Sequence, residues 1–306
     1  MRNHLVAELE KLAQKDERIC LFTGDLGFGV LDNFAKLFPD RFFNAGISEQ
    51  NMTTVACGMA LEGNIAYTYS IGNFPGVRCL EQIRNDICYH NANVKIIVVG
   101  GGFAYGQLGM SHHATEDLAM MRALPNMHVF CPSDAKEAVE VLRLANGIDG
   151  PCYIRLAKGK EPDLHADGAR LDVRKIDTIQ TGGKTAVIST GPILGEVLKA
   201  AANLEKDGIK IGIYNVVSIK PIDNLSIEKI AKEYEHIISL EEHNVMGGLG
   251  GVISEVIADM QGERAQLTRM GLQDVYTSIV GSQEYLREYY GMSAQSIVNK
   301  VIEMER

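Results

Sequence analysis

The sequence predicts an α/β protein built from two doubly wound domains of unequal size. Short apolar runs rich in β-branched residues alternate with longer segments whose apolar residues recur at helical spacing. Near-continuous apolar strands between helices are typical of parallel sheets that helices cover on both faces. The alternation is interrupted once, after about residue 158, and the chain of 306 residues is long enough for two domains.

The first domain is expected at residues 1–160. Four strands are predicted in it, at 19–23, 94–99, 128–131 and 152–156. Three of the four end next to glycine or proline, which commonly terminate regular structure. The N-terminal residues follow a helical period, and a further helix is predicted at 135–146, where Gly147 ends it.

Residues 161–182 are predicted to link the two domains, because this stretch is polar and contains two glycines and a proline. The second domain is expected at 183–306. Its predicted strands lie at 185–189, 210–217 and 236–240. Helices are predicted at 195–206 and after the glycine-rich run 247–251, so the same alternation resumes in this part of the chain.

Composition and charge exclude several classes of protein. With 30 Lys and Arg against 39 Asp and Glu, the net charge is −9 without a basic block, so no binding to nucleic acid or to a membrane surface is expected. No run approaches the ~18 apolar residues of a membrane span, and the N-terminus lacks the apolar core of a signal peptide. Six scattered cysteines predict reduced, mostly buried thiols, no structural zinc and a cytoplasmic location.

Ligands in open α/β sheets bind beyond the carboxyl ends of the strands, which directs attention to the loops at 24–29, 46–51 and 100–116. The glycines of 24–29 do not have the spacing of a dinucleotide fingerprint. No Gly-Lys-Ser or Gly-Lys-Thr follows, which excludes a phosphate loop of the Walker type. The simplest interpretation of 24–29 is a flexible strand end.

Glu49 follows a predicted N-cap residue, Ser48, and opens a helix. This position by itself is typical of an acidic residue that the helix dipole favours. The following residues 52–60 are apolar almost all round, which predicts a buried helix. A carboxylate that opens a buried helix is desolvated and needs a partner, so Glu49 is also a candidate functional residue.

Two further residues have both a structural and a functional interpretation. His112 and His113 are adjacent and do not share a helix face, which argues against a paired metal site. A single loop histidine such as His112 is either structural or catalytic. Phe74 lies among glycines and a proline and is either a core residue or a stacking surface.

Several segments together resemble one family. In chain order they are 38–52, 81–84, 116–126, 131–134, 219–223, 241–243, 247–250 and 290–292. They resemble the pyrimidine-binding and C-terminal domains of transketolases and 1-deoxyxylulose-5-phosphate synthases over nearly the whole chain. The resemblance implies a thiamine-diphosphate-binding pyrimidine domain followed by a smaller transketolase C-terminal-like domain.

In that family, thiamine diphosphate binds between two domains, and a Gly-Asp-Gly motif in the other domain holds the diphosphate through a metal ion. This sequence contains no Gly-Asp-Gly. The resemblance therefore implies one subunit of a split transketolase, in an α2β2 complex whose N-terminal subunit carries the diphosphate-binding domain and the Mg²⁺ ligands. A truncated chain is the alternative. The implied reaction transfers a two-carbon ketol unit from a ketose or ketose phosphate to an aldose.

The resemblance also implies roles for residues at the cofactor. Glu49 matches the glutamate that activates it: a protonated carboxyl at N1′ of the pyrimidine favours the imino tautomer, which can remove the C2 proton of the thiazolium. Phe74 matches an aromatic residue that packs against the pyrimidine. Ile71 lies where many relatives have another aromatic residue, so weaker stacking is expected there.

Three residues are implied at the substrate. His112 matches the family's active-site histidine and is expected to donate hydrogen bonds to substrate hydroxyls or to the developing alkoxide. Arg155 matches the arginine that binds the substrate phosphate. Leu108 replaces an acidic contact to a donor hydroxyl, so the identity of the sugar, phosphorylated or not, is left open.

Two other functions are weighed against this one. A beta subunit of a 2-oxo acid dehydrogenase has a similar length and layout and a matching glutamate, but residues 122–126 and 290–292 favour the transketolases. A non-catalytic, regulatory pyrimidine-domain protein is the third interpretation. The joint presence of Glu49, Phe74 and His112 argues against it.

Overall fold

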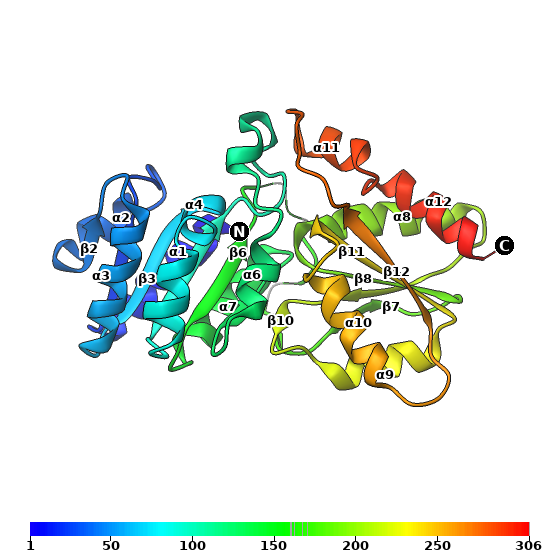
Figure 1. Ribbon diagram of the computed structural model, residues 1–306, viewed down its shortest axis with the longest axis horizontal. Helices are drawn as coiled ribbons and strands as arrows, with labels where there is room; N and C mark the ends of the chain where they lie inside the picture. The colour runs from blue at the N-terminus through cyan, green and yellow to red at the C-terminus, as the bar shows by residue number, and fades with distance from the viewer. Residues whose placement is uncertain (160, 162, 167, 170, 306) are drawn as a thin grey trace.

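The computed structural model describes residues 1–159, 161, 163–166, 168–169 and 171–305. Two α/β units lie side by side along the long axis of the molecule (Figure 1). Residue 160, the predicted end of the first domain, lies outside the described residues, as do 162, 167 and 170 of the predicted linker and residue 306.

The first unit is built on a seven-stranded sheet in the order β10-β5-β6-β4-β3-β1-β2. Its strands are β1 (Ile19–Thr23), β2 (Phe42–Asn44), β3 (Ile65–Ile71), β4 (Val94–Val99), β5 (His128–Phe130), β6 (Cys152–Leu156) and β10 (Ser218–Lys220). The pairs are parallel, except that β10 runs antiparallel to β5. All four predicted strands are present, whereas the sequence pattern does not predict β2, β3 and β10.

Helices cover both faces of this sheet. The helical segments are α1 (Arg2–Lys15), α2 (Asp32–Leu37), η1 (Pro39–Arg41), α3 (Glu49–Leu61), α4 (Asn73–Gly76), α5 (Leu80–Gln82), the π-helical η2 (Ile83–Cys88), η3 (Gly106–Leu108), η4 (Met110–His112), α6 (Asp117–Ala123) and α7 (Ala135–Asn146). Residues of α1 and α7 form one hydrophobic cluster, and residues of α3, η2 and α6 belong to another. Ile96 and Val98 of β4 lie in one cluster and Ile97 and Val99 in the other, which confirms the doubly wound arrangement.

The second unit contains a five-stranded sheet in the order β12-β11-β8-β9-β7. Its strands are β7 (Asp177–Gln180), β8 (Thr185–Ser189), β9 (Gly212–Asn215), β11 (His236–Asn244) and β12 (Gln266–Leu272). Its helices are η5 (Gly191–Ile193), α8 (Leu194–Lys206), α9 (Asn224–Glu233), α10 (Leu249–Asp259), α11 (Gln283–Tyr289) and α12 (Ala294–Met304). This unit matches the predicted alternation of strands and helices.

The two units are joined more closely than the predicted linker suggests. β7 lies inside the stretch 161–182 and forms an antiparallel edge of the second sheet. β10 comes from the second half of the chain but pairs with β5 in the first sheet. One hydrophobic cluster contains buried residues of both units, such as Cys131 and Ile188. The part of 161–182 at β7 is therefore sheet and not linker.

The helix that Glu49 opens is only half buried, so the expectation of a helix buried all round is wrong. Met52 and Ala56 of α3 are fully buried, whereas Val55 is 45% exposed. The sequence pattern could not separate the two faces, because both carry small or apolar residues. The exposed side of α3 is mostly polar, with Val55 among Gln50, Asn51 and Thr54.

The cysteines agree with the sequence prediction, since all six are buried and unpaired. A search of the described helices finds none that is long and apolar enough to cross a membrane.

Candidate active site

Glu49 is the first residue of α3, and its side chain is buried beneath the loop that precedes the helix. Arg78 Nη1 donates a hydrogen bond of 2.9 Å to Glu49 Oε2. The described residues provide no donor to the other oxygen, Oε1. A Cβ at Gly24 would lie in ordinary van der Waals contact with Glu49 Cγ, at 3.4 Å, so the backbone just after β1 lies directly beside the Glu49 side chain. Glu49 thus has a single cationic partner and one carboxylate oxygen available.

Phe74 lies next to this pair, on the short helix α4 that follows β3. The Arg78 guanidinium carbon lies 4.9 Å from the centroid of the Phe74 ring, which is within range of a cation–π contact. The ring itself is half-buried. Arg78 therefore connects the predicted glutamate with the predicted aromatic residue.

His112 is in edge-to-face contact with Phe74, with 5.1 Å between the ring centroids. It ends η4, and the hydroxyl of Ser111 lies 3.0 Å from its Nδ1. Asn73 Nδ2 donates to the carbonyl oxygen of Ser111 at 2.9 Å, which ties this loop to α4. The structure therefore brings Glu49, Phe74 and His112 into one continuous set of contacts.

Ile71 ends β3, three residues before Phe74, and is half-buried. Its register partner is Val99 at the end of β4. This places Ile71 at the carboxyl edge of the sheet, where the loops with Phe74 and His112 begin. Its predicted contact with a pyrimidine stays a prediction.

A cavity of about 390 Å³ lies along residues 104–108 of the loop that precedes His112, although His112 itself does not line it. Tyr105, Leu108 and Lys158 are among its lining residues. Tyr105 lies 6.3 Å from His112 between ring centroids, and Lys158 Nζ lies 4.4 Å from the Tyr105 centroid. Leu108 is 55% exposed. The cavity thus has an apolar side chain and an exposed cation within reach of the histidine loop.

Arg155 does not line this cavity, and the structure does not show the exposed side chain that was expected for a phosphate contact. It lies on β6 with 4% of its surface exposed, and its Nε donates to Asp117 Oδ2 at 2.9 Å. Burial by itself disfavours the charge, but the Asp117 carboxylate outweighs this and raises the pKa of Arg155. The cavity beside the guanidinium has a volume of about 10 Å³, which is room for about one water molecule.

Sequence reasoning missed Arg78, Tyr105 and Lys158. Arg78 is the one cation between Phe74 and Leu80, where α5 begins. Lys158 is the first cation after β6. A search for charged residues just past the strand ends could have found both. Tyr105 gives no comparable signal, because its role depends on contacts with His112 and Lys158.

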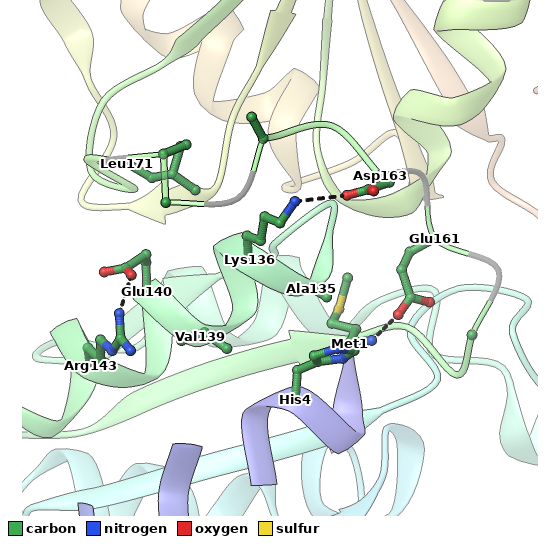
Figure 2. A pocket seen from close by; sticks show the side chains of 14 residues that line it. Met1, His4, Ala135, Lys136, Val139, Glu140, Arg143, Glu161, Asp163 and Leu171 are labelled. Atoms are coloured by element: carbon green, nitrogen blue, oxygen red, sulfur yellow. Dashed lines mark hydrogen bonds and ion pairs between the residues drawn. The ribbon is translucent and has the colours of Figure 1, made fainter. Parts of the chain in front are cut away.

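Another, larger cavity of about 990 Å³ lies elsewhere, between the N-terminus, α7 and the predicted linker (Figure 2). Its charged residues pair with one another. The Met1 ammonium contacts Glu161, and Arg143 Nη1 lies 2.6 Å from Glu140 Oε1. None of the predicted site residues lines this cavity.

Among the described residues, one group of His, Cys, Asp or Glu side chains is close enough to hold a metal ion: Asp134, Glu137 and His165. This group joins α7 to the predicted linker and to Asp177 of β7. It is not part of the contacts around Glu49. The described side chains near Glu49 thus offer no metal-ligand set.

Comparison with known proteins identifies two family domains in the chain. Residues 1–162 match the transketolase pyrimidine binding domain, and residues 174–297 match the transketolase C-terminal domain. One of the subunits of the apulose-4-phosphate transketolase of Actinobacillus succinogenes is 36% identical over 89% of this chain and 87% of its own length. A putative transketolase C-terminal section of Methanocaldococcus jannaschii is 36% identical over 99% of this chain and 95% of its own length.

A solved structure is similar over the same extent. It is described as a split gene transketolase, inactive beta4 tetramer, and superimposes with a TM-score of 0.87 at 35% identity. The match covers 99% of this chain and 96% of that chain.

Proposed function

This chain belongs to the transketolase family, and on that premise we propose that it is the pyrimidine-domain subunit of a split, thiamine-diphosphate-dependent transketolase. With a separate N-terminal subunit it would transfer a two-carbon ketol unit from a ketose, or ketose phosphate, to an aldose. The observation that carries this proposal is the continuous contact of Glu49, Phe74 and His112. The missing Gly-Asp-Gly motif supports a partner subunit that holds the diphosphate and Mg²⁺.

The residues fit the pyrimidine end of the cofactor. Glu49 would hold a proton at N1′ of the pyrimidine through Oε1, the oxygen that Arg78 leaves available. Phe74 would pack on the ring, with Ile71 at its edge. Arg78 is half exposed and covers part of Phe74, so its side chain would move aside when the ring enters. When bound, thiamine diphosphate supplies a nucleophilic carbon and an electron sink.

The cavity beside His112 would receive the substrate. His112 would donate a hydrogen bond to a substrate hydroxyl, and Lys158 would contact a phosphate or another anionic end. We propose Lys158 for this role in place of Arg155, because only Lys158 is exposed and lines the cavity. Leu108 lines the same cavity and cannot form a hydrogen bond, so discrimination among donor hydroxyls would be weak. The relative from A. succinogenes is named for a phosphorylated sugar, which supports an anionic substrate.

Exposed apolar side chains around Glu49 support the proposed partner. Phe28 and Ile47, on the loops that flank the glutamate, are 77% and 80% exposed, and Val77 beside Arg78 is 42% exposed. A partner subunit, in an α2β2 complex, would cover these side chains and exclude water from the cofactor. We place this complex in the cytoplasm, where unpaired thiols persist.

The test compares the chain alone with the chain co-expressed with an N-terminal subunit that carries Gly-Asp-Gly. A ketose with an aldose acceptor should be converted only by the complex, in the presence of thiamine diphosphate and Mg²⁺. Activity with pyruvate and lipoamide instead would support the 2-oxo acid dehydrogenase alternative. A complex that does not bind the cofactor would support the regulatory one.

A further inference from the structure

The loop that carries His112 is anchored by a few specific contacts on either side of the histidine. Gly102 and Ala114 form an isolated antiparallel bridge, with N–O distances of 2.8 and 3.1 Å. His113 is buried, and its Nδ1 lies 2.6 Å from Thr277 Oγ1 of the second unit. The position of His112 therefore depends on both units, although the histidine itself belongs to the first.

Arg155 connects the bridge to both units. Its Nη2 donates to the carbonyl oxygen of Ala114 at 2.7 Å and to that of Glu242 on β11 at 3.1 Å. Its Nε donates to Asp117 Oδ2, at the start of α6. The same Asp117 oxygen accepts a hydrogen bond of 2.8 Å from the hydroxyl of Tyr153. The buried side chain of Arg155 thus binds both ends of the segment 114–117, which follows His112.

Glu242 holds the other side of the bridge. Its Oε1 accepts hydrogen bonds from the backbone N–H of Phe103 at 2.6 Å and from Gln283 Nε2 at 2.8 Å. Its Oε2 pairs with Arg287 of α11. Gly102 has a φ of +62°, and a Cβ there would lie 2.4 Å from Glu242 Oε1, so the carboxylate packs directly against the bridge.

We propose that Arg155 is a positioning residue for His112, and that Arg155 of the first unit and Glu242 of the second unit together clamp the Gly102–Ala114 bridge. The role rests on the proposed function, because His112 is the group that is positioned. In this proposal the second unit helps to position the substrate loop, because Glu242 on its strand β11 binds the segment that contains Gly102 and Phe103. Arg155 acts through the backbone of Ala114 and not by contact with the substrate.

The variant Arg155→Lys keeps the charge but cannot reach two acceptors in the plane of a guanidinium fork. In the complex with the N-terminal subunit, we expect kcat to fall about tenfold with KM changed less than about twofold. The fall should be the same for phosphorylated and unphosphorylated ketoses. Hydrogen exchange of the 109–116 backbone should become about tenfold faster, while exchange in β8 and β12 stays unchanged.

The matched control is Glu255→Gln, which breaks another ion pair between the two units. Arg122 of α6 pairs with Glu255 of α10, outside the bridge. We expect wild-type kinetics and wild-type exchange at 109–116 from this variant. If Glu255→Gln speeds exchange at 109–116 as much as Arg155→Lys does, then any contact between the units would be enough to hold this loop, and the proposal is overturned.

Two further outcomes would contradict the proposal. A rise in KM for phosphorylated ketoses alone, with unchanged exchange, would make Arg155 a phosphate ligand. Faster exchange throughout both sheets would make it a general stability residue. Should Arg155→Lys not fold, Asp117→Asn removes one acceptor with little change of volume and must give the same local exchange. The exchange measurement needs no turnover, so it remains decisive if the transketolase activity is absent.

Discussion

In each unit a buried glutamate lies at the start of a helix, but the two carboxylates have different partners. Glu49 begins α3 and has one partner among the described side chains, Arg78, which is half exposed. Glu241 of β11 faces the start of α10, where its Oε2 accepts from Leu249 N at 2.7 Å and its Oε1 from Gly250 N at 2.8 Å. A helix N-terminus is an anion site, and in the second unit the protein's own carboxylate fills it.

The carboxylate of Glu49 is therefore available for chemistry, whereas that of Glu241 stabilises the fold. Burial does not distinguish them, since Glu49 is 3% and Glu241 1% exposed. The same contrast holds for two lysines. Lys95 is fully buried and donates to the carbonyl oxygens of Ile148 and Gly150, whereas Lys158 is exposed and lines the substrate cavity. What matters is how many protein partners already occupy the polar atoms.

The largest expected effect is that of Glu49→Gln on turnover. An amide cannot share a proton with N1′, so kcat of the complex should fall at least about a hundredfold. Exchange of the cofactor's C2 proton should slow in parallel, as NMR with bound thiamine diphosphate would measure. The free energy of unfolding should fall by no more than about 1 kcal/mol, because the partner Arg78 is half exposed and can be solvated. Unchanged C2 exchange would reduce Glu49 to a helix-opening residue.

Glu241→Gln should have the opposite profile. Gln offers one carbonyl oxygen and directs an NH₂ group at a backbone N–H, so one buried donor loses its acceptor. We expect a loss of about 1–3 kcal/mol in the free energy of unfolding, measured with denaturant. C2 exchange in the assembled complex should remain at the wild-type rate. If the two glutamine variants behave alike, the contrast between the glutamates is not real.

Lys158→Met should affect only substrates with an anionic end. Loss of one charge-assisted contact should raise KM for a ketose phosphate about tenfold. KM for the unphosphorylated sugar should stay the same. Lys158→Arg is the matched control and should retain most of the affinity, since the charge remains. An equal rise in KM for both sugars would place the phosphate elsewhere.

Leu108→Asp should sharpen selectivity in the same cavity. A carboxylate can accept a hydrogen bond from a donor hydroxyl, which leucine cannot do. We expect the ratio of kcat/KM between a ketose with this hydroxyl and its deoxy analogue to increase about fivefold. A panel of ketoses assayed with the complex measures the ratio. The matched variant Leu108→Asn, without the charge, separates hydrogen bonding from repulsion of the phosphate.

The smallest expected effect is a pH dependence of stability, and it comes from the cluster of Asp134, Glu137 and His165 at the predicted linker. Burial raises the pKa of Glu137 to about 7. Burial alone would lower the pKa of His165, but its hydrogen bonds to Asp134 and Asp177 raise it. Both groups therefore bind protons more strongly in the folded than in the unfolded chain, and stability should fall as the pH rises through neutrality.

Thermal unfolding of the chain between about pH 6 and pH 8 measures this dependence. His165→Gln removes one of the two titrating groups, so the melting temperature of this variant should depend less on pH. A melting temperature that increases over this range would contradict the assignment.

The sequence predicts the strands that are continuous apolar runs. The bounds of β1, β4 and β6 agree with the structure because each is mostly apolar and is buried on both faces, although β4 and β6 each carry one buried cation. The apolar pattern does not predict β3, because this strand contains tyrosines, a threonine and a serine. All of its residues except the last are nevertheless buried. β7 and β10 are short edge strands whose pairing depends on distant residues, Asn215 and Phe130 among them.

The candidate site divides in the same way. Glu49 and His112 lie on loops, 46–51 and 100–116, that the sequence analysis selects because ligands bind at the carboxyl ends of parallel strands. Phe74 follows β3, which the sequence pattern does not predict, and is chosen by its resemblance to a family residue. Arg155 shows where this reasoning fails. It lies inside β6, three residues before Lys158, and Asp117 and the backbone carbonyl groups of Ala114 and Glu242 bind its side chain at the junction between the units.

The sequence by itself therefore determined the fold class, the two α/β units and the residue types at the sheet edge, because periodicity and chain order are local properties. Only the tertiary structure decided which polar atoms are already bound. Arg78 reaches Glu49 from 29 residues away, and Arg155 reaches Glu242 from 87 residues away. Such pairings follow from how the sheets and their loops pack, and no local pattern in the chain records them.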